Sequence, residues 1–134
     1  MPFQAKHRFA RISPRKARLL MDLVRGRDVD DAINLLRFSK QRVSGMIEKV
    51  IRSAVANASE QEVSPSRNTL FVAQAWVDPG PVIKRFQPKD RGKAYSIKKR
   101  TSHLVVTIDE REEGERASVS LKRTVGARHG RARQ

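Results

Sequence analysis

The segment PGPVIKRFQPKDRGKAYSIKKRTSH, residues 79–103, decides the fold because of the two runs that flank it. LFVAQAWV precedes it and LVVTI follows it, and both runs are rich in residues that favour strands. The segment itself contains many Lys and Arg residues and few large apolar side chains. We therefore predict a β-hairpin whose outer part, at about residues 79–103, is strongly basic.

The predicted hairpin is too long to lie within a compact body. If its strands begin near Leu70, end near Ile108 and turn near PKDRG, each arm of about 18 residues extends roughly 50 to 60 Å. A compact domain of this size has a radius of gyration of about 13 Å, so the outer hairpin should protrude. Because an isolated two-stranded ribbon is marginal in water, we expect a partner outside the chain to stabilise it.

The side chains of the hairpin indicate the kind of partner. Lys and Arg that bind phosphates release counterions, and Phe86 and Tyr95 are suited to stacking on unpaired bases. These features favour folded RNA, although duplex DNA also accepts a two-stranded ribbon in its major groove. Pro79, Pro81 and Pro88 should make the pairing irregular. A solvated basic loop without strand pairing is the simpler alternative.

The charge of the chain is divided into blocks. The 134 residues carry a formal charge of +15. Residues 1–27 hold eight Lys or Arg against one acid, residues 28–80 hold six against seven, and residues 81–103 hold eight against one. An ordinary solvated surface intersperses both signs, so this division indicates one side that faces a polyanion and one side that packs.

Several classes of protein are disfavoured by what the chain lacks. It contains no Cys, which excludes disulfides and thiolate metal sites. Its apolar runs are far shorter than the roughly 20 residues that span a bilayer, and its first residues lack the apolar core of a signal peptide. A membrane-surface helix is disfavoured because the apolar residues of the helices are needed for the core. We expect a cytoplasmic protein.

Two short helices are predicted before residue 40. The first begins with Ser13 as a cap and Pro14 in the first turn, and it ends near Gly26. The second runs from about Val29 to Phe38 behind the cap Asp28. The predicted apolar faces are Ala17, Leu20, Leu23 and Val24 in the first helix, and Ala32, Ile33, Leu35 and Leu36 in the second.

A third helix should form the centre of the core. Its apolar stripe follows helical spacing over about five turns and comprises Val43, Met46, Ile47, Val50, Ile51, Ala54 and Ala58. The small residues of SAVANAS, residues 53–59, should let another element approach closely. We interpret Asn57 and Ser59 as packing residues and not as catalytic ones.

The remaining segments complete an α+β prediction. KHRFARI near the N-terminus suits an edge strand, and the run from Leu104 to Ile108 suits a buried one. LFVAQAWV lacks clean alternation, so its buried face is not predicted. We expect three helices packed on a small antiparallel three-stranded sheet, as a single domain over residues 1–110 with the protruding hairpin, followed by a flexible basic tail over residues 111–134.

Enzymatic chemistry has little support in the sequence. His7, His103 and His129 lack the companions of metal-binding motifs, and the cluster DPGP lacks the Lys and Ser or Thr of a phosphate-binding loop. We expect His103 to make a structural hydrogen bond and not to act as a general base. No catalytic residue, metal, cofactor or small-molecule substrate is predicted. A nucleoid-type DNA-binding protein remains the alternative to an RNA-binding protein, since charge alone does not separate them.

Four motifs carry a resemblance to a known family. SPRK followed by RG at residues 13–26, SAVANA at 53–58, VDPGPVIKR at 77–85 and GKAYSIKKRTSH at 92–103 occur in this order. Together they make residues 4–110 resemble the L-twenty-two family of bacterial large-subunit ribosomal proteins. The chain departs from the family pattern at Asp90, at Tyr95 and in its longer tail.

The resemblance implies a structural, RNA-binding constituent of the ribosome. Its partners would be large-subunit ribosomal RNA and neighbouring ribosomal proteins, with the globular part near the peptide exit and the hairpin lining the exit tunnel. The implied RNA-contact residues are Lys6, Arg8, Arg11, Ser13, Arg15, Lys16, Arg18 and Arg25 near the N-terminus, and Lys84, Arg85, Lys89, Arg91, Lys93, Lys98, Lys99, Arg100, Thr101, Ser102 and His103 on the hairpin. The implied tunnel segment comprises Ile83, Lys84, Arg85, Phe86, Pro88, Asp90 and Gly92.

Overall fold

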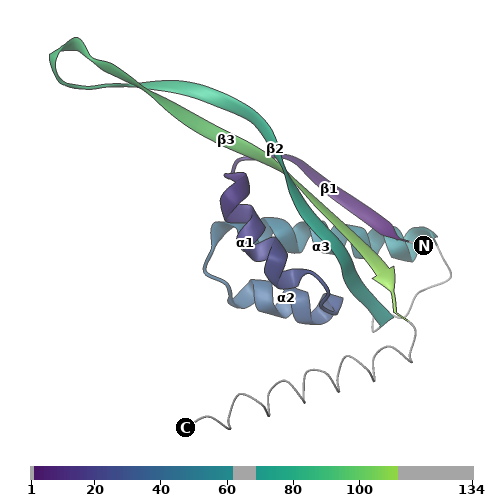
Figure 1. Cartoon of the computed structure of the whole chain (residues 1–134). Helices are drawn as coiled ribbons and strands as arrows, with labels where there is room; N and C mark the ends of the chain where they lie inside the picture. Colours follow the sequence, from purple (N-terminus) through teal and green to yellow (C-terminus); the bar gives the residue numbers. More distant parts are fainter. Residues whose placement is uncertain (1, 62–68, 112–134) are drawn as a thin grey trace, which may run out of the picture.

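The described residues, 2–61 and 69–111 in this computed structural model, form three helices on one face of an antiparallel sheet (Figure 1). The strands are β1 (Phe3–Ala10), β2 (Leu70–Pro88) and β3 (Ala94–Glu110). The helices are α1 (Pro14–Val24), α2 (Val29–Phe38) and α3 (Arg42–Gln61), and a short 3-10 turn, η2 (Asp90–Gly92), joins β2 to β3. The predicted α+β class, with three helices and a three-stranded sheet, is confirmed.

Strand β3 lies in the middle of the sheet, in the order β1-β3-β2. The N-terminal strand is therefore an edge strand, as predicted. The run from Leu104 to Ile108 is buried at every position, because it has a strand on each side and helices over one face. On the helix-covered face, Val106 pairs with Ala5 of β1 and Ala75 of β2.

Strands β2 and β3 stay paired far beyond the helices. Their register runs from Leu70 opposite Glu110 to Pro88 opposite Ala94, and the outer half projects away from the body (Figure 1). The turn is closed by a hydrogen bond of 2.7 Å from the Lys89 N–H to the Lys93 carbonyl. The basic segment is thus a paired ribbon and not an unpaired loop.

Helix α1 packs on a different face from the predicted one. Ala17, Leu20 and Val24 are buried as expected, but Leu23 is 49% exposed and Met21 is fully buried in its place. The prediction for Leu23 was wrong because the side of the helix that faces the core is the side that carries Met21, and Leu23 lies at the opposite margin of the stripe. The buried set at 17, 20, 21 and 24 is the one that three-and-four spacing produces on a single face.

The other two helices agree with their predicted stripes in most positions. In α2, Ala32, Ile33 and Leu36 are buried, whereas Leu35 is half-buried. In α3, the apolar stripe is buried except for Met46, which packs partly exposed against the core. Ser13 and Asp28 stand at the predicted N-caps, but neither side chain makes the expected capping hydrogen bond.

Three irregularities interrupt the sheet. Ala73 is an extra residue in β2, which explains why LFVAQAWV shows no clean alternation. Two residues of β1, Arg8 and Phe9, lie opposite His103 alone, and two residues of β2, Gly80 and Pro81, lie opposite Thr101 alone. The last two bulges flank Ser102 on either side of β3, where the body ends and the projecting hairpin begins.

Arg111 closes the opposite end of the sheet. Its backbone N–H donates to the Thr69 carbonyl at 2.9 Å, and its side chain forms an ion pair with Asp28 at 3.3 Å. The guanidinium also lies 4.4 Å from the centre of the Phe71 ring. Arg111, assigned by the prediction to the tail, is thus held against the body. The rest of the predicted flexible tail lies outside the described residues.

Candidate nucleic-acid interface

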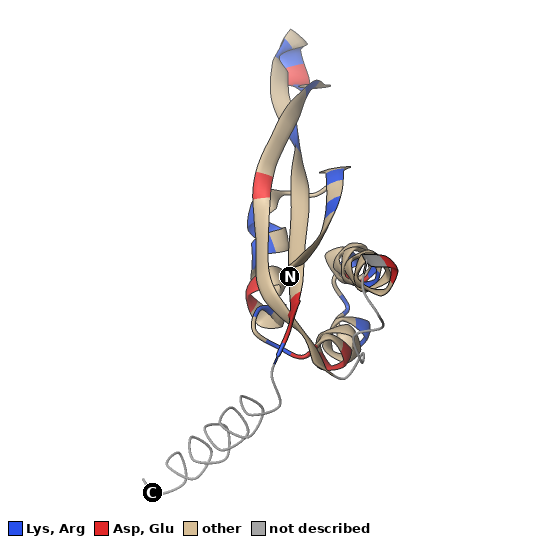
Figure 2. Ribbon diagram, turned by 90° about the vertical axis from the view of Figure 1, so that its right-hand side faces the viewer, with Lys and Arg blue, Asp and Glu red and all other residues tan. Residues whose placement is uncertain are grey.

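The cations of the projecting hairpin are exposed and uncompensated. Figure 2 shows Lys and Arg along the ribbon as far as its tip, where Asp90 is the acid that accompanies them. Among the described residues, no ion pair includes any of these cations. The exposed set is Lys84, Arg85, Lys89, Arg91, Lys93, Lys98, Lys99 and Arg100.

The aromatic side chains of the ribbon are exposed as well. Phe86 is 76% exposed and Tyr95 is 54% exposed, and the Lys89 ammonium lies 5.9 Å from the centre of the Tyr95 ring. Exposed rings beside cations suit contact with bases and phosphates of one nucleic acid. The implied tunnel residues extend from Ile83 at the hairpin root to Gly92 at its tip, so they form a line along the ribbon and not one compact site.

Like charges face each other across the ribbon. Lys84 pairs directly with Lys98, and the neighbouring pairs place Ile83 opposite Lys99 and Val82 opposite Arg100. Like charges directly opposite one another destabilise an antiparallel pair. The geometry of the ribbon therefore favours a bound polyanion that neutralises both strands.

Some cations of the body, unlike those of the hairpin, form ion pairs with acids. Glu48 of α3 forms ion pairs with Arg37 at 3.2 Å and with Arg52 at 2.7 Å. Glu48, an acid of the neutral middle of the chain, thus neutralises two cations on the helices, whereas Asp90 is the single acid between residues 81 and 103.

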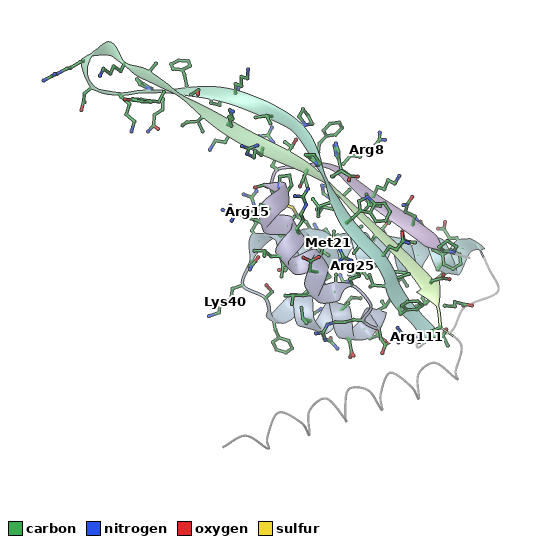
Figure 3. All side chains as sticks on the ribbon, viewed as in Figure 1. Arg8, Arg15, Met21, Arg25, Lys40 and Arg111 are labelled. Atoms are coloured by element: carbon green, nitrogen blue, oxygen red, sulfur yellow. The ribbon has the colours of Figure 1, made fainter. Side chains whose placement is uncertain are left out.

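The basic residues near the N-terminus divide into two groups. Arg8 and Arg15 point away from the body (Figure 3), and Lys6, Arg11 and Lys16 are exposed too. The other two predicted contacts, Arg18 and Arg25, tie α1 to β2.

Arg25 makes the stronger of these two ties. Its Nη2 donates to the Ala75 carbonyl at 2.6 Å while its Nη1 lies 3.0 Å from Asp22, and Arg18 Nη2 donates to the Val77 carbonyl at 3.3 Å. Part of their hydrogen-bonding capacity is therefore used within the protein.

The segment Thr101–His103 forms the junction between body and hairpin. Thr101 is buried and its hydroxyl donates to the Pro81 carbonyl at 2.6 Å. Ser102 is fully buried, and its hydroxyl has no hydrogen-bond partner among the described residues. His103 accepts a hydrogen bond at Nδ1 from the Phe9 N–H at 3.0 Å, which is the predicted structural role. These three side chains, predicted as RNA contacts, lie within the sheet.

A cationic groove lies between the body and the root of the hairpin. Its cavity volume is about 1110 Å³. Among its lining residues are Arg11, Ser13 and Lys16 of the predicted N-terminal contacts, and Arg85, Lys98, Lys99 and Arg100 of the predicted hairpin contacts. The fold thus brings together two groups of residues that are far apart in the sequence.

Gln41 and Arg42, at the start of α3, also line this groove, and the sequence analysis missed them. The net charge of residues 28–80 did not indicate them, because the cations of that segment are balanced by about as many acids. Arg42 itself has no acid as an immediate neighbour in the sequence. Only the position of the α3 N-terminus beside the hairpin root reveals its place in the basic surface.

No group of three or more His, Asp or Glu side chains in the described ranges is arranged to hold a metal ion. Within the same ranges, none of the helices has the length and apolar character to cross a membrane. Asn57 donates to the Gln4 carbonyl at 3.0 Å and so joins α3 to β1, in agreement with a packing role. Ser59 is exposed and donates to the Val55 carbonyl of its own helix at 3.0 Å, so the packing interpretation was wrong for Ser59.

Comparison with known proteins identifies the family. Residues 5–109 match the family model described as "Ribosomal protein L22p/L17e". A "Large ribosomal subunit protein uL22" of Carboxydothermus hydrogenoformans is 46% identical over 114 residues, which cover 85% of this chain and all of the relative. A protein of the same name from Bdellovibrio bacteriovorus is 44% identical over 111 residues, covering 83% of this chain and all of the relative. The family match and the two relatives agree with the observed fold, a helix-covered sheet with a paired basic hairpin. Members of this family are structural proteins and not enzymes. The chain belongs to the L22p/L17e family of ribosomal proteins.

Proposed function

We propose that this protein is a structural constituent of the large ribosomal subunit that binds large-subunit ribosomal RNA. The observation that carries the proposal is the projecting ribbon, whose exposed cations have no ion-pair partner among the described residues. Such a ribbon gains stability when phosphates neutralise it. The relatives named above are proteins of the large ribosomal subunit, which supports the same assignment.

In this proposal the two parts of the molecule occupy different positions. The helix-covered body lies on the outside of the subunit near the peptide exit, in the cytoplasm, beside neighbouring ribosomal proteins. The hairpin extends into the subunit, and the segment from Ile83 to Gly92 lines the exit tunnel. The length of the ribbon and the exposure of most of its side chains support this arrangement, because only a surrounding structure would hold the ribbon in place.

The RNA contacts divide between the two basic groups. The exposed residues Lys6, Arg8, Arg11, Arg15 and Lys16 serve the body, and the eight exposed cations of the hairpin serve the ribbon. Binding at both ends of the molecule would join separate RNA segments and thereby support assembly of the subunit. No observation on the described residues favours a nucleoid-type DNA-binding protein.

Sedimentation of a cell extract at moderate and then high salt tests the function. We expect the chain to sediment with the large subunit and to remain there at high salt, because the contacts of the body and of the whole ribbon must all break before the chain can leave. Release into the soluble pool at moderate salt would contradict the proposal and return DNA to consideration.

The tunnel position needs a separate test. A photo-crosslinking amino acid at Phe86 should react with ribosomal RNA or with a nascent peptide in ribosomes stalled during translation. The same amino acid at Phe38, which is 88% exposed at the end of α2, should not react with the nascent peptide. Reaction of the nascent peptide with the crosslinker at position 38 and not at position 86 would contradict the proposed tunnel position of the hairpin.

A further inference from the structure

The groove at the hairpin root has two basic walls. Arg85, Lys98, Lys99 and Arg100 form the wall on the hairpin, and Arg11, Lys16 and Arg42 form the wall on the body. None of the acidic residues in the described ranges lines it. The body wall combines the turn after β1, helix α1 and the start of α3, so three separate elements converge on one hairpin surface.

Other features of the groove also favour an anion. The N-terminal ends of α1 and α3 reach it at Ser13 and Arg42, and helix N-termini present free N–H groups and partial positive charge. The Ser13 hydroxyl makes no capping bond within the helix. Between the cations lie the accessible apolar side chains of Ile12, Leu19 and Ile83, which are suited to contact sugars or base faces.

We propose that this groove binds the sugar-phosphate backbone of one RNA strand, and that the bound strand clamps the hairpin against the body. The inference rests on the proposed RNA-binding function and assigns to it a specific site, with Arg42 as an additional phosphate contact. A cavity of about 1110 Å³ with seven cations on two walls suits several successive phosphates, since a single small anion would leave most of the cations without a partner.

The clamp follows from the charges on the two walls. In the free protein the hairpin wall and the body wall repel each other, since each carries several cations and no acid among the residues that the structure describes. A polyanion between them replaces this repulsion with attraction on both sides. The hairpin joins the body at the bulge of Gly80 and Pro81 opposite Thr101, where the regular pairing is interrupted and the Thr101 hydroxyl donates to the Pro81 carbonyl. Bound RNA therefore restricts the orientation of the hairpin relative to the body.

Arg42→Gln tests the site, with Lys49→Gln as the matched control. Both residues are exposed on α3 and each substitution removes one positive charge, but only Arg42 lines the groove. Affinity of the full chain for large-subunit ribosomal RNA transcribed in vitro is measured across a series of salt concentrations. We expect Arg42→Gln to reduce the slope of log affinity against log salt by about 1, and Lys49→Gln to leave the slope unchanged.

The outcomes separate this inference from the general function. A slope reduced by about 1 means that the affinity deficit of Arg42→Gln shrinks about fourfold between about 50 and 200 mM salt. If the wild-type chain binds this RNA and the two variants behave alike, the groove is not the site. If the wild-type chain does not bind this RNA specifically, the proposed function itself fails.

The clamp has its own measurement. Because the chain contains no Cys, spin labels can be attached at Ser53→Cys on α3 and Ser96→Cys on the hairpin, both exposed and both outside the groove. We expect the distribution of distances between the labels to narrow when the same RNA is added, and to narrow less in the Arg42→Gln background. An equally broad distribution with saturating RNA would overturn the clamp.

Discussion

At Gly80 the backbone of β2 comes close to the Thr101 side chain of the neighbouring strand. A Cβ atom added there would lie 2.5 Å from the Thr101 hydroxyl and 3.2 Å from the Thr101 backbone. The same hydroxyl donates to the Pro81 carbonyl across the bulge. The absence of a side chain at Gly80 therefore allows the bulge to form at the junction of body and hairpin.

Gly80→Ala should destabilise the protein by about 1–3 kcal/mol, because Thr101 must move and its hydrogen bond is strained or lost. Gly45→Ala is the matched control, since nothing lies within 4 Å of a Cβ at that exposed position in α3. That substitution should stabilise by about 0.5–1 kcal/mol, as Ala is the better helix former. Chemical denaturation measures both, and an equal sign for the two would contradict the close approach at Gly80.

His103 holds the other bulge. Its Nδ1 accepts from the Phe9 N–H, and the two rings meet edge to face with centroids 4.9 Å apart. Phe9 has a positive φ of 56°, which a bulky residue adopts only when its surroundings hold it there.

His103→Ala should therefore destabilise the protein by roughly 1 kcal/mol, since the acceptor for the Phe9 N–H disappears. His103→Asn can supply an acceptor oxygen near the same position and should recover most of the loss. Thermal unfolding of both variants checks this expectation. Equal stability of the wild type and His103→Ala would show that the imidazole does not stabilise the bulge.

Single residues also mark where prediction from sequence succeeds and fails. The helical stripe of α3 was predictable because seven apolar positions define its face redundantly. In α1 fewer apolar residues are available, and Leu23 and Met21 are equally apolar, so only the contacts with the core separate the buried one from the exposed one. Arg42 could not be predicted because its role depends on the distance between α3 and a hairpin that begins far along the chain.

At the scale of elements, the hairpin combines strong backbone pairing with unfavourable side-chain pairing. Its ladder is complete from Val82 opposite Arg100 to Pro88 opposite Ala94, but Lys84 faces Lys98 and no buried apolar layer lies beneath it. Local stability follows buried contacts, so we expect the outer ribbon to open more readily than the sheet of the body.

Lys84→Glu should separate the stability of the ribbon from its function. The new carboxylate would face the Lys98 ammonium and form a favourable cross-strand pair in place of a repulsive one. We expect slower amide exchange at Phe86 and Ser96 in the free protein, together with weaker binding to ribosomal RNA.

Lys84→Gln is the control for this change, because it relieves the repulsion without adding an attraction. Its exchange rates should fall between those of the wild type and Lys84→Glu. If Lys84→Glu bound RNA more tightly than the wild type, the ribbon would not be neutralised by phosphates as we propose.

The existence of each element was predictable from periodicity and composition, but the bulges were not. The bulge at Ala73 adds one residue to a strand of β-forming residues. In the sequence its effect is only that apolar and polar residues do not alternate regularly. The bulges opposite Thr101 and His103 depend on contacts between strands that are distant in the sequence. Prolines did indicate irregular pairing near residue 80, since they cannot donate to the ladder.

At the scale of the whole molecule, the core and the basic surface occupy different regions. The core lies between α3, α1 and the helix-covered face of the sheet, with Ile51 fully buried within it. The groove and the ribbon lie beyond the N-terminal ends of α1 and α3. Stability and RNA binding should therefore respond to different substitutions.

Ile51→Ala should lower the free energy of unfolding by about 2–5 kcal/mol, because it leaves a cavity in a tightly packed region. The same variant should bind ribosomal RNA with wild-type affinity at a temperature well below its midpoint of unfolding. Denaturation and binding measured on one preparation check both expectations, and a parallel loss of affinity would mean that the core shapes the interface directly.

The order of the sheet has a consequence for how the chain acquires its structure during synthesis. β1 pairs only with β3, and Phe3 lies opposite Ile108 at the far end of the described chain. During translation the first strand emerges early and has no neighbour until the last strand has been made. The helices can form one after another as they appear, whereas the sheet closes in a late step that brings both ends of the domain together. Closure between such distant segments is slower than helix formation, so we expect the first strand to stay unpaired until β3 has emerged.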